Sequence, residues 1–398
     1  MRNEILCLVA VLAGGCAKPR AAEPPVPSPS PVTPTPGNQA AEDPPPRAGA
    51  TPHAIDVAAA GLRTCALLSD GAVRCWGSGV GGSLGDGTMH PPGVAASGLV
   101  AGLPDATRVE IARRSGCAVT SGGAVKCWGE RIAFMHEGTP ARGGRAEAVP
   151  FPHATNVVAL DLGLDNHCLV QQNGETYCWG QRPKSVGPPP SAGPTFPLVR
   201  VANELDAVDV AVGSQHVCAL ARDRSLWCWG DNGAGQLGVG DTKTRTKPTR
   251  VSGRMGGSIV AVAAFDEATC ALARSGELAC WGGFICGPLS DCSRPDVIQK
   301  RPLAAAATAT VSDFAMGGTL VVATTEGSVL EADLMDAIVG AGLKTVSGVP
   351  SATAVAAGAM HTCTLDEAHR VWCWGSNNNG QVKPGSTDEV VGAVVSLP

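Results

Sequence analysis

The chain has little tyrosine, little charge and no clustered basic residues, and each shortage argues against a class of partner. Only one of its 398 residues is tyrosine, so the tyrosine-rich surfaces common at protein interfaces are absent. Charged residues make up 16% of the chain, and the formal net charge is −5. Duplex nucleic acid requires a basic surface, whereas the pair Arg113–Arg114 is isolated and predicts a solvated strand edge. We therefore expect no nucleic-acid partner.

The sequence also lacks the motifs on which common enzyme and metal sites depend. It contains no nucleophile motif, no phosphate-binding loop and no cysteines grouped with histidines at metal-ligand spacing. His216 and His361 each stand two residues before a cysteine of the repeat described below, and His167 stands one residue before. Recurrence at one place in a repeat indicates a structural role. We predict a protein that is not an enzyme, with no catalytic residue, metal or cofactor.

What the chain has in abundance is a cysteine repeat. Six times a cysteine is followed, after nine intervening residues, by Cys-Trp-Gly, and the copies recur about every fifty residues. If the two cysteines of a copy face each other across an antiparallel hairpin, a three-residue loop joins the strands. Its third residue favours glycine because it takes a left-handed conformation. Gly71 stands there in the first copy, and glycine is replaced only by Arg224 and His369 in two others.

Directly opposed cysteines in an antiparallel pair lie close enough for a disulfide. Each bond closes a short loop, so its stabilisation should lie at the low end of roughly 2–4 kcal/mol. The tryptophan after each second cysteine points to the opposite face of its strand, and we expect it to pack against the neighbouring repeat. The predicted disulfides are Cys65–Cys75, Cys117–Cys127, Cys168–Cys178, Cys218–Cys228, Cys270–Cys280 and Cys363–Cys373.

A seventh, altered unit precedes the last one. Residues 323–333 fit the hairpin if Gly327 takes the turn position, which places Val321 and Glu331 where cysteines stand elsewhere and Ala332 in place of tryptophan. We predict this unit to be the weakest. Each unit also has an apolar stretch before its first cysteine, giving three to four short strands and no helix. This period with glycine-rich turns predicts an all-β, seven-bladed β-propeller over residues 53–398.

The two ends of the chain suggest how the ring closes. Residues 346–350 are followed directly by the opening strand of the last unit. The chain ends at 394–398 with a sequence like 346–350, and residues 52–61 are like that opening strand. We therefore expect a ring closed by both chain ends, with one blade completed by both, which would remove exposed strand edges.

The first 52 residues predict export. Residues 1–16, with Arg2, an apolar run and small residues before Cys16, are similar to a bacterial lipoprotein signal, although Ala13 stands where leucine is usual. We expect Cys16 to carry lipid; the alternative is an ordinary signal peptide cut nearby. The apolar run is too short to span a bilayer. Residues 17–52 are rich in proline and predict an extended, disordered tether with a reach on the order of 100 Å.

The sixteen cysteines can all be assigned. Cys7 would leave with the signal, Cys16 would carry lipid and twelve would pair in hairpins, leaving Cys286 and Cys292, separated by five residues, for a local disulfide. A zinc site is the alternative for these pairs, but their spacing does not favour it. With no thiol left over, we expect an oxidising compartment, at the outer membrane or cell surface.

The units resemble the regulator of chromosome condensation (RCC1) repeat. The similarity is carried by residues 212–220 and 229–241, with looser copies at 76–86 and 374–381, and extends over nearly everything after residue 52. It implies a seven-bladed propeller, and the cysteine pairs resemble a bacterial extracellular variant. It implies little about function, because the family includes a nucleotide-exchange factor for Ran, a secreted β-lactamase inhibitor and many bacterial surface proteins.

We predict a monomeric, envelope-anchored propeller that binds a protein or glycan and contacts the membrane only through its lipid. The resemblance leaves two alternatives: an inhibitor of a secreted or periplasmic enzyme, and a guanine-nucleotide exchange factor, which export and disulfides disfavour. The repeat pattern lapses at 129–150, 181–199 and 283–302, which we interpret as blade-linking segments. Loops on a rigid scaffold commonly bind partners. The candidate binding residues are Arg131, Phe134, His136, Arg182 and Phe284.

Overall fold

The computed structural model describes most of the chain after residue 50. The described residues are 51–130, 144–151, 154–164, 166–180, 198–202, 205–251, 258–284, 297–304, 309–338, 340, 342–384, 387 and 390–395. The predictions for the signal sequence, Cys16, the tether and the pair Cys286–Cys292 concern residues outside these ranges.

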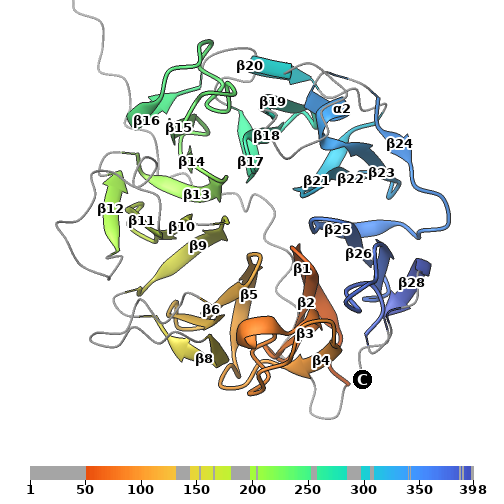
Figure 1. Ribbon diagram of the computed structural model, residues 1–398. Coiled ribbons are helices and arrows are strands. Elements are labelled where there is room, and N and C mark those ends of the chain that lie inside the picture. Colours follow the sequence, from red (N-terminus) through yellow and green to blue (C-terminus); the bar gives the residue numbers. More distant parts are fainter. Residues whose placement is uncertain are drawn as a thin grey trace, which may run out of the picture. The chain divides into compact units, whose positions relative to one another are not determined.

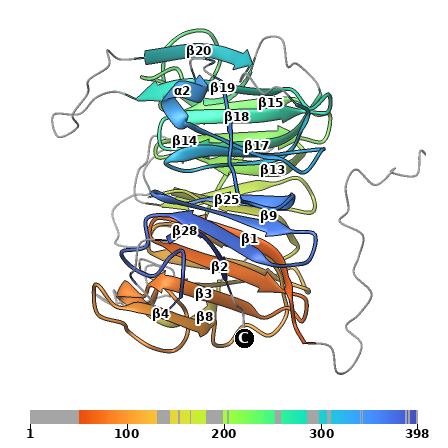
Figure 2. The same ribbon diagram turned by 90° about the vertical axis from the view of Figure 1, so that its right-hand side faces the viewer.

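Seven four-stranded antiparallel sheets form a ring, which confirms the predicted seven-bladed propeller (Figures 1 and 2). The first strand of each blade lies innermost and the fourth outermost. Blade 1 contains β1 (Ala54–Ala60), β2 (Arg63–Leu68), β3 (Val73–Ser78) and β4 (Ala95–Leu99). Blade 2 contains β5 (Ala106–Ile111), β6 (Ser115–Thr120), β7 (Val125–Gly129) and β8 (Arg145–Pro150). Blade 3 contains β9 (Val157–Leu162), β10 (Asn166–Gln171), β11 (Thr176–Gly180) and β12 (Val199–Ala202).

The remaining four blades follow the same order. Blade 4 contains β13 (Ala207–Val212), β14 (His216–Ala221), β15 (Leu226–Gly230) and β16 (Arg245–Arg250). Blade 5 contains β17 (Ile259–Phe265), β18 (Ala268–Ala273), β19 (Leu278–Phe284) and β20 (Val297–Ala304). Blade 6 contains β21 (Val311–Met316), β22 (Thr319–Thr324), β23 (Val329–Asp333) and β24 (Lys344–Thr345). Blade 7 contains β25 (Ala352–Ala357), β26 (His361–Asp366), β27 (Val371–Gly375) and β28 (Val390–Val395).

Two expectations need correction. The ring does close between its first and last blades, but each blade consists of four consecutive strands, so none is completed by both chain ends. The match between residues 394–398 and 346–350 marks a repeat boundary, which falls at the same place in every unit. The units also contain short helices: the 3-10 helix η1 (Val80–Gly82) in blade 1 and α2 (Leu334–Ile338) in blade 6.

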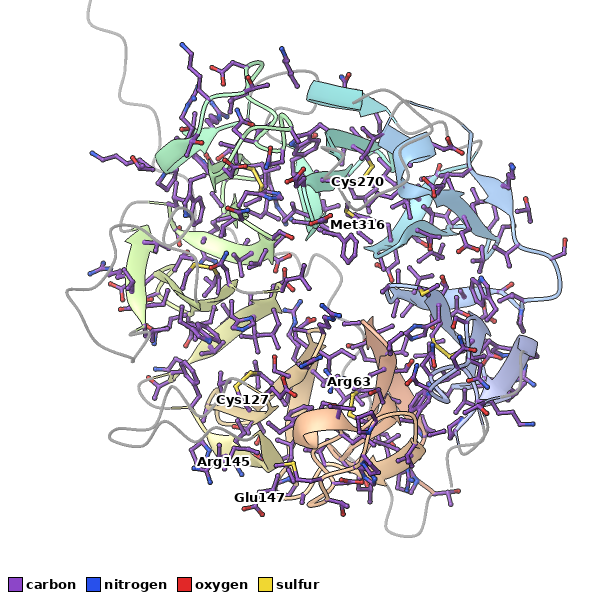
Figure 3. The ribbon with its side chains drawn as sticks, in the orientation of Figure 1. Arg63, Cys127, Arg145, Glu147, Cys270 and Met316 are labelled. Carbon is purple, nitrogen blue, oxygen red and sulfur yellow. A yellow bond between two sulfur atoms is a disulfide. The ribbon has the colours of Figure 1, made fainter. Side chains whose placement is uncertain are left out.

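The hairpin register is the predicted one. In six blades the two cysteines are directly opposed and joined by a disulfide, with Cα atoms 4.0–4.1 Å apart (Figure 3). Val321 faces Glu331 in blade 6, and Gly327 takes the turn position with φ 81°. Arg224 and His369 adopt φ 69° and 60°. These two residues therefore take the left-handed conformation that glycine takes in the other turns.

Five of the six disulfides pack against the indole of the next blade. The buried bond Cys65–Cys75 of blade 1 packs in one cluster with Trp128 of blade 2. The same arrangement is found at four further junctions: between blades 2 and 3, blades 3 and 4, blades 4 and 5, and blades 7 and 1. At the junction of blades 7 and 1, Trp76 packs against the disulfide Cys363–Cys373. The predicted packing of the tryptophans against neighbouring repeats is thus confirmed. Because a large indole buries much apolar area, this contact is the main apolar link between blades.

Blade 6 departs from this pattern on both sides. Where blade 6 meets blade 5, Ala332 replaces the indole, and Leu334, Ala337 and Ile338 from α2 pack against the cysteines of blade 5. The helix therefore occupies the space that a tryptophan fills elsewhere. Where blade 6 meets blade 7, Trp374 packs on a cluster that has no disulfide.

A chain of hydrogen bonds crosses the junction between blades 7 and 1. The indole Nε1 of Trp76 and the hydroxyl of Thr64 both donate to the backbone oxygen of Gln381, at 2.9 and 3.0 Å. The hydroxyl of Thr64 also lies 2.8 Å from Nε2 of His361. Since the single hydroxyl proton goes to Gln381, the imidazole must donate to Thr64 and carry its proton on Nε2.

The same chain links blades 4 and 5. There His216 Nε2 lies 2.8 Å from the hydroxyl of Thr269, which donates to Gln236, as does Trp281. His216 and His361 are thus structural, as their recurrence indicated. Burial lowers the pKa of each of these imidazoles to about 4, so both are neutral at physiological pH.

Arg63 occupies the position of these histidines in blade 1. Its guanidinium is buried and donates to three backbone oxygens, those of Ser83, Ala112 and Ser115. Trp128 donates to the same oxygen of Ser83, so one long side chain takes the place of the His–Thr pair. Burial lowers the pKa of Arg63 to about 9.

Glu331 supplies the acceptor between blades 6 and 7. Its carboxylate accepts hydrogen bonds from Trp374 Nε1 at 3.0 Å and from the hydroxyl of Thr362 at 3.2 Å. In the complete junctions a backbone oxygen accepts from these same two groups. The residue that replaces a cysteine in blade 6 therefore serves the indole of blade 7.

Removing the Glu331 carboxylate should weaken the ring at blade 6. We expect Glu331→Ala to lower the free energy of unfolding by about 1–3 kcal/mol, because it leaves two donors without an acceptor. Glu331→Gln keeps one acceptor oxygen, so its free energy of unfolding should lie between those of the wild type and of Glu331→Ala. Urea denaturation measures the change. The control Glu326→Ala, exposed in the turn of the same blade, should stay within about 0.5 kcal/mol of wild type; equal losses from both alanine variants would refute the role of Glu331.

The neutral histidines should make the fold acid-sensitive. Their folded pKa lies below the unfolded value, so their stabilisation is complete above about pH 6.5 and is lost as the pH falls toward 4. Replacing His216 and His361 by asparagine, the residue that blade 3 has at this position as Asn166, should flatten the pH profile of stability by on the order of 1 kcal/mol per pH unit per histidine. The exposed His369→Asn is the control. Parallel profiles for wild type and the double variant would contradict the prediction.

Candidate functional site

The two faces of the ring differ in the connections they display. The face we call the long-loop face carries the connections between first and second strands and between third and fourth strands. The opposite, short-turn face carries the three-residue hairpin turns and the links from blade to blade. The irregular segments at 129–150, 181–199 and 283–302 join third to fourth strands within blades 2, 3 and 5. They are therefore not blade-linking segments.

The predicted binding residues belong to these segments. Arg131, Phe134, His136 and Arg182 lie outside the described residues. Phe284 is the last residue of β19, and its backbone pairs with Val297, while its side chain is outside the described part. The structure brings none of the five candidates into a described site.

The described site is the channel along the axis of the ring. It encloses about 710 Å³ and is lined by the innermost strands of all seven blades. Its charged lining residues number six acids and two bases: Asp56, Glu110, Asp161, Asp209, Asp266, Asp313, Arg108 and Arg113. Small residues, mostly alanine and glycine, line much of the remaining wall and leave room for these side chains.

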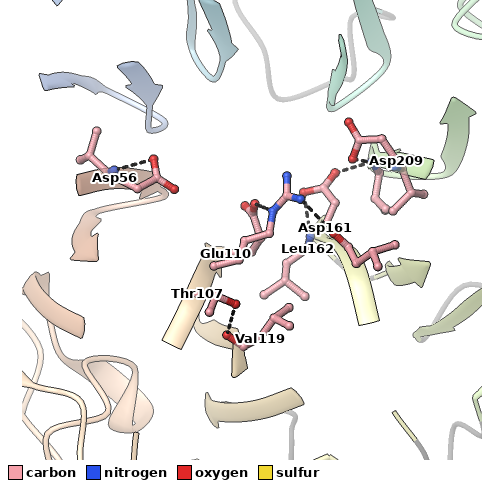
Figure 4. A network of polar contacts seen from close by, with 12 residues as sticks. Asp56, Thr107, Glu110, Val119, Asp161, Leu162 and Asp209 are labelled. Carbon is pink, nitrogen blue, oxygen red and sulfur yellow. Dashed lines mark hydrogen bonds and ion pairs between the residues drawn. The ribbon is translucent and has the colours of Figure 1, made fainter. Parts of the chain in front are cut away.

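The strand register places the deeper charges in two rows. The first row is defined by its backbone partner, which is the residue two places after the first cysteine of the hairpin. In blade 6, Val321 stands in place of that cysteine. This row contains Asp56, Arg108, Asp209 and Asp313. Glu110 and Asp161 pair with that cysteine itself and so lie one row closer to the long-loop face. Figure 4 shows Asp56, Glu110, Asp161 and Asp209 projecting from separate blades.

Several of these carboxylates also connect blades. Asp161 of blade 3 accepts from the backbone N–H of Val212 in blade 4 at 2.6 Å. Asp313 of blade 6 accepts from Val355 in blade 7 at 3.0 Å. Arg108 lies among them, donating to Glu110 at 3.3 Å and to a backbone oxygen of blade 3. The ring of charge is thus held in place by backbone groups of neighbouring blades.

Enclosure by the ring raises the pKa of every carboxyl in the two rows. Burial is the largest cause for each, and for Glu110 and Asp161 the nearby carboxylates add to it. The pKa of Asp313 rises to about 6, and those of Asp56 and Asp209 are also raised. Burial acts to lower the pKa of Arg108, but the surrounding carboxylates reverse this and raise it. A cation entering the channel would favour the ionised carboxylates.

The mouth of the channel on the long-loop face is lined by apolar side chains together with Arg113 and Asp266. Leu62, Leu164 and Met360 lie in turns between first and second strands, and Phe265 and Met316 end the innermost strands of blades 5 and 6. Met360 is 65% exposed and Leu164 44% exposed. Figure 3 shows Met316 at the inner edge of the ring. We call these five residues the apolar rim.

The sequence did not reveal the channel. Each acid is a single residue in an apolar strand, such as Asp56 within 54–60, and only ring closure brings the acids together. Their recurrence at fixed places before the hairpin cysteine was the available signal. Arg113, expected on a solvated strand edge, instead lines the mouth, whereas Arg114 is exposed and pairs with Glu130 at 3.0 Å.

Within the described ranges, no three histidine, cysteine, aspartate or glutamate side chains cluster so as to hold a metal ion. Nor does any helix in those ranges have the length and apolar character needed to cross a membrane. What the channel can do is receive a cationic or apolar group through its mouth.

Comparisons with known proteins agree with the fold. Models of the regulator of chromosome condensation (RCC1) repeat match residues 207–236, 352–381 and 223–272. The ultraviolet-B receptor UVR8 of Arabidopsis thaliana is 27% identical over 365 residues, covering 85% of this chain and 80% of the receptor. The human E3 ubiquitin-protein ligase HERC2 is 25% identical over 82% of this chain, which spans only 6% of that much longer protein.

Solved structures show the same architecture. Human WBSCR16 superposes with a TM-score of 0.67 at 18% identity, covering 83% of this chain and 95% of that one. Yeast RCC1 (Prp20), in complex with Kap60, superposes with a TM-score of 0.50 at 19% identity, over 86% of this chain and 75% of that one. The repeat-model matches and the curated relatives support the RCC1-like repeat family for this chain, and its seven blades agree with that family.

Proposed function

We propose that this propeller is a non-enzymatic binding protein of the cell envelope, anchored by lipid on Cys16, which holds a protein partner on its long-loop face. The observation that carries the proposal is that the connections between first and second strands and between third and fourth strands leave the sheets on this one face, where the described residues Met89, Leu164 and Met360 are exposed. Rigid scaffolds commonly place binding residues in such loops.

The ring is well suited to hold those loops. Six disulfides each join the second and third strands of a blade, and hydrogen bonds join neighbouring blades, so the ends of neighbouring blades keep their spacing. A rigid surface loses little conformational entropy on binding. The polar groups buried at the junctions are engaged in holding the ring, which leaves the channel and the loop ends for a partner.

Related propellers support a protein as the partner. The yeast RCC1 structure holds Kap60, and a second study of Prp20p concerns its binding to Gsp1p and histones. The partners differ, so the similarity supports the class of function and not a particular partner. Export, inferred from residues 1–16, would place the partner of this chain in the envelope.

Crosslinking should distinguish the two faces. A photo-crosslinking amino acid at Met89 or Met360, both exposed on the long-loop face, should yield discrete adducts on intact cells. The matched positions Glu326 and Glu367, in exposed turns of the short-turn face, should yield none. Mass spectrometry of the adducts identifies the partner, and adducts lost after glycosidase treatment would identify a glycan. Equal adducts from both faces, or adducts from the short-turn face alone, would rule out the proposed orientation.

Anchoring through Cys16 is tested separately. Cys16→Ser should move the protein from the membrane fraction to the soluble fraction and abolish labelling by a fatty-acid analogue. Cys7→Ser changes a residue that the signal peptidase would remove, and should leave both properties unchanged. A Cys16→Ser protein that stays labelled and membrane-bound would exclude this anchor.

A further inference from the structure

We propose that the channel mouth on the long-loop face receives a protein loop that inserts one arginine or lysine side chain past the apolar rim toward Glu110 and Asp161. This inference deepens the proposed function and rests on it, because it specifies the chemistry of the partner. It stands on two separate observations, the exposed apolar rim and the charge of the wall beneath it.

The rim is an exposed apolar surface with a concave centre. Met360 and Leu164 stand in turns of blades 7 and 3, and Phe265 and Met316 line the same channel. Large apolar side chains exposed around a cavity mark interaction sites more often than scattered ones do. An apolar group entering the mouth would bury them.

The wall beneath the rim selects a cation. Acids outnumber bases six to two among the charged lining residues. One of the two bases, Arg108, is already engaged with Glu110 and a backbone oxygen. Because 28% of the Glu110 side chain remains exposed, a guest can still reach its carboxylate. Charge complementarity therefore favours a positively charged group.

The depth of the acids favours a long side chain. Glu110 stands three residues before Arg113 at the mouth, which along a strand is about 10 Å. Arginine and lysine combine an apolar stem with a charged head, and the stem can lie along an apolar surface while the head reaches beyond it. A loop tip with such a residue, flanked by apolar neighbours, matches the rim and the wall together.

The guest should bind more tightly as the pH rises. Asp56, Glu110, Asp161, Asp209 and Asp313 all have raised pKa values, so part of their charge is missing in mildly acidic solution. Deprotonation at higher pH adds negative charge to a channel whose other charged residues are Arg108 in the wall and Arg113 and Asp266 at the mouth. Binding of a cation should accordingly release protons.

The experiment uses the mature, full-length protein and two cyclic peptides. One presents Leu-Arg-Leu at its tip, and the other presents Leu-citrulline-Leu, which has the same shape without the charge. Titration calorimetry at about pH 7.5 should show the arginine peptide binding at least about ten-fold more tightly. The preference should shrink at about pH 5.5, where more of the channel carboxyls are protonated.

Matched variants distinguish the contribution of the apolar rim to binding from that of the charged wall. The double variant that combines Glu110→Gln with Asp161→Asn should abolish the preference for the arginine peptide. The control double variant combines Glu326→Gln with Glu367→Gln, which makes the same change in charge on the short-turn face, and it should preserve the preference. Leu164→Ser, Met360→Ser should weaken both peptides alike. The control Met89→Ser lies on the same face outside the channel lining and should weaken neither.

Three results would overturn the inference. The first is equal affinity for the two peptides, and the second is no binding of either peptide up to about 1 mM. The third is binding of spermidine as tight as that of the arginine peptide, because the wall would then bind small cations and not a protein loop. If crosslinking nevertheless finds a partner on the long-loop face, the proposed function stands and only the role of the channel fails.

Discussion

Everything in this ring depends on the contact between one blade's disulfide and the next blade's indole. The two parts occupy opposite faces of a strand, so every blade except blade 6 presents an indole to one neighbour and a disulfide to the other. The indole nitrogen then needs an acceptor, because a buried donor left unpaired is costly. Ser83, Gln236 and Gln381 supply a backbone oxygen at three junctions, and Glu331 supplies a carboxylate at a fourth. At these four junctions, apolar packing and a polar bond together fix the spacing of the blades.

The sequence predicts what lies within one unit better than what lies between units. The opposition of Cys65 and Cys75, and even that of Val321 and Glu331, follows from strand alternation and turn length, which are local. The sharing of one blade between both chain ends was mispredicted, because the sequence of residues 394–398 also occurs in similar form within the chain, at 346–350, and does not say where a sheet begins. The family models match 207–236 and 352–381, which contain the histidine and glutamine of the two complete junctions.

The channel acids and the role of Glu331 escaped prediction for a related reason. Glu331 accepts a hydrogen bond from Trp374, which is 43 residues further along the chain. No sequence pattern within either unit predicts that contact. Asp161 and Asp313 each look like an isolated polar residue in an apolar strand, although their oxygens bond the next blade. α2 was missed because its five residues are too few for helical periodicity to show, and it forms where an indole is lacking.

The short span of every disulfide has a consequence for biogenesis. Each bonded pair is ten positions apart, and no other cysteine of the described residues falls between its members. A chain oxidised as it emerges, N-terminus first, meets its cysteines in the order in which they pair. From Cys65 onward, consecutive oxidation therefore gives the native bonds in these hairpins, and folding of the ring need not wait for an isomerase to exchange wrong pairs between blades.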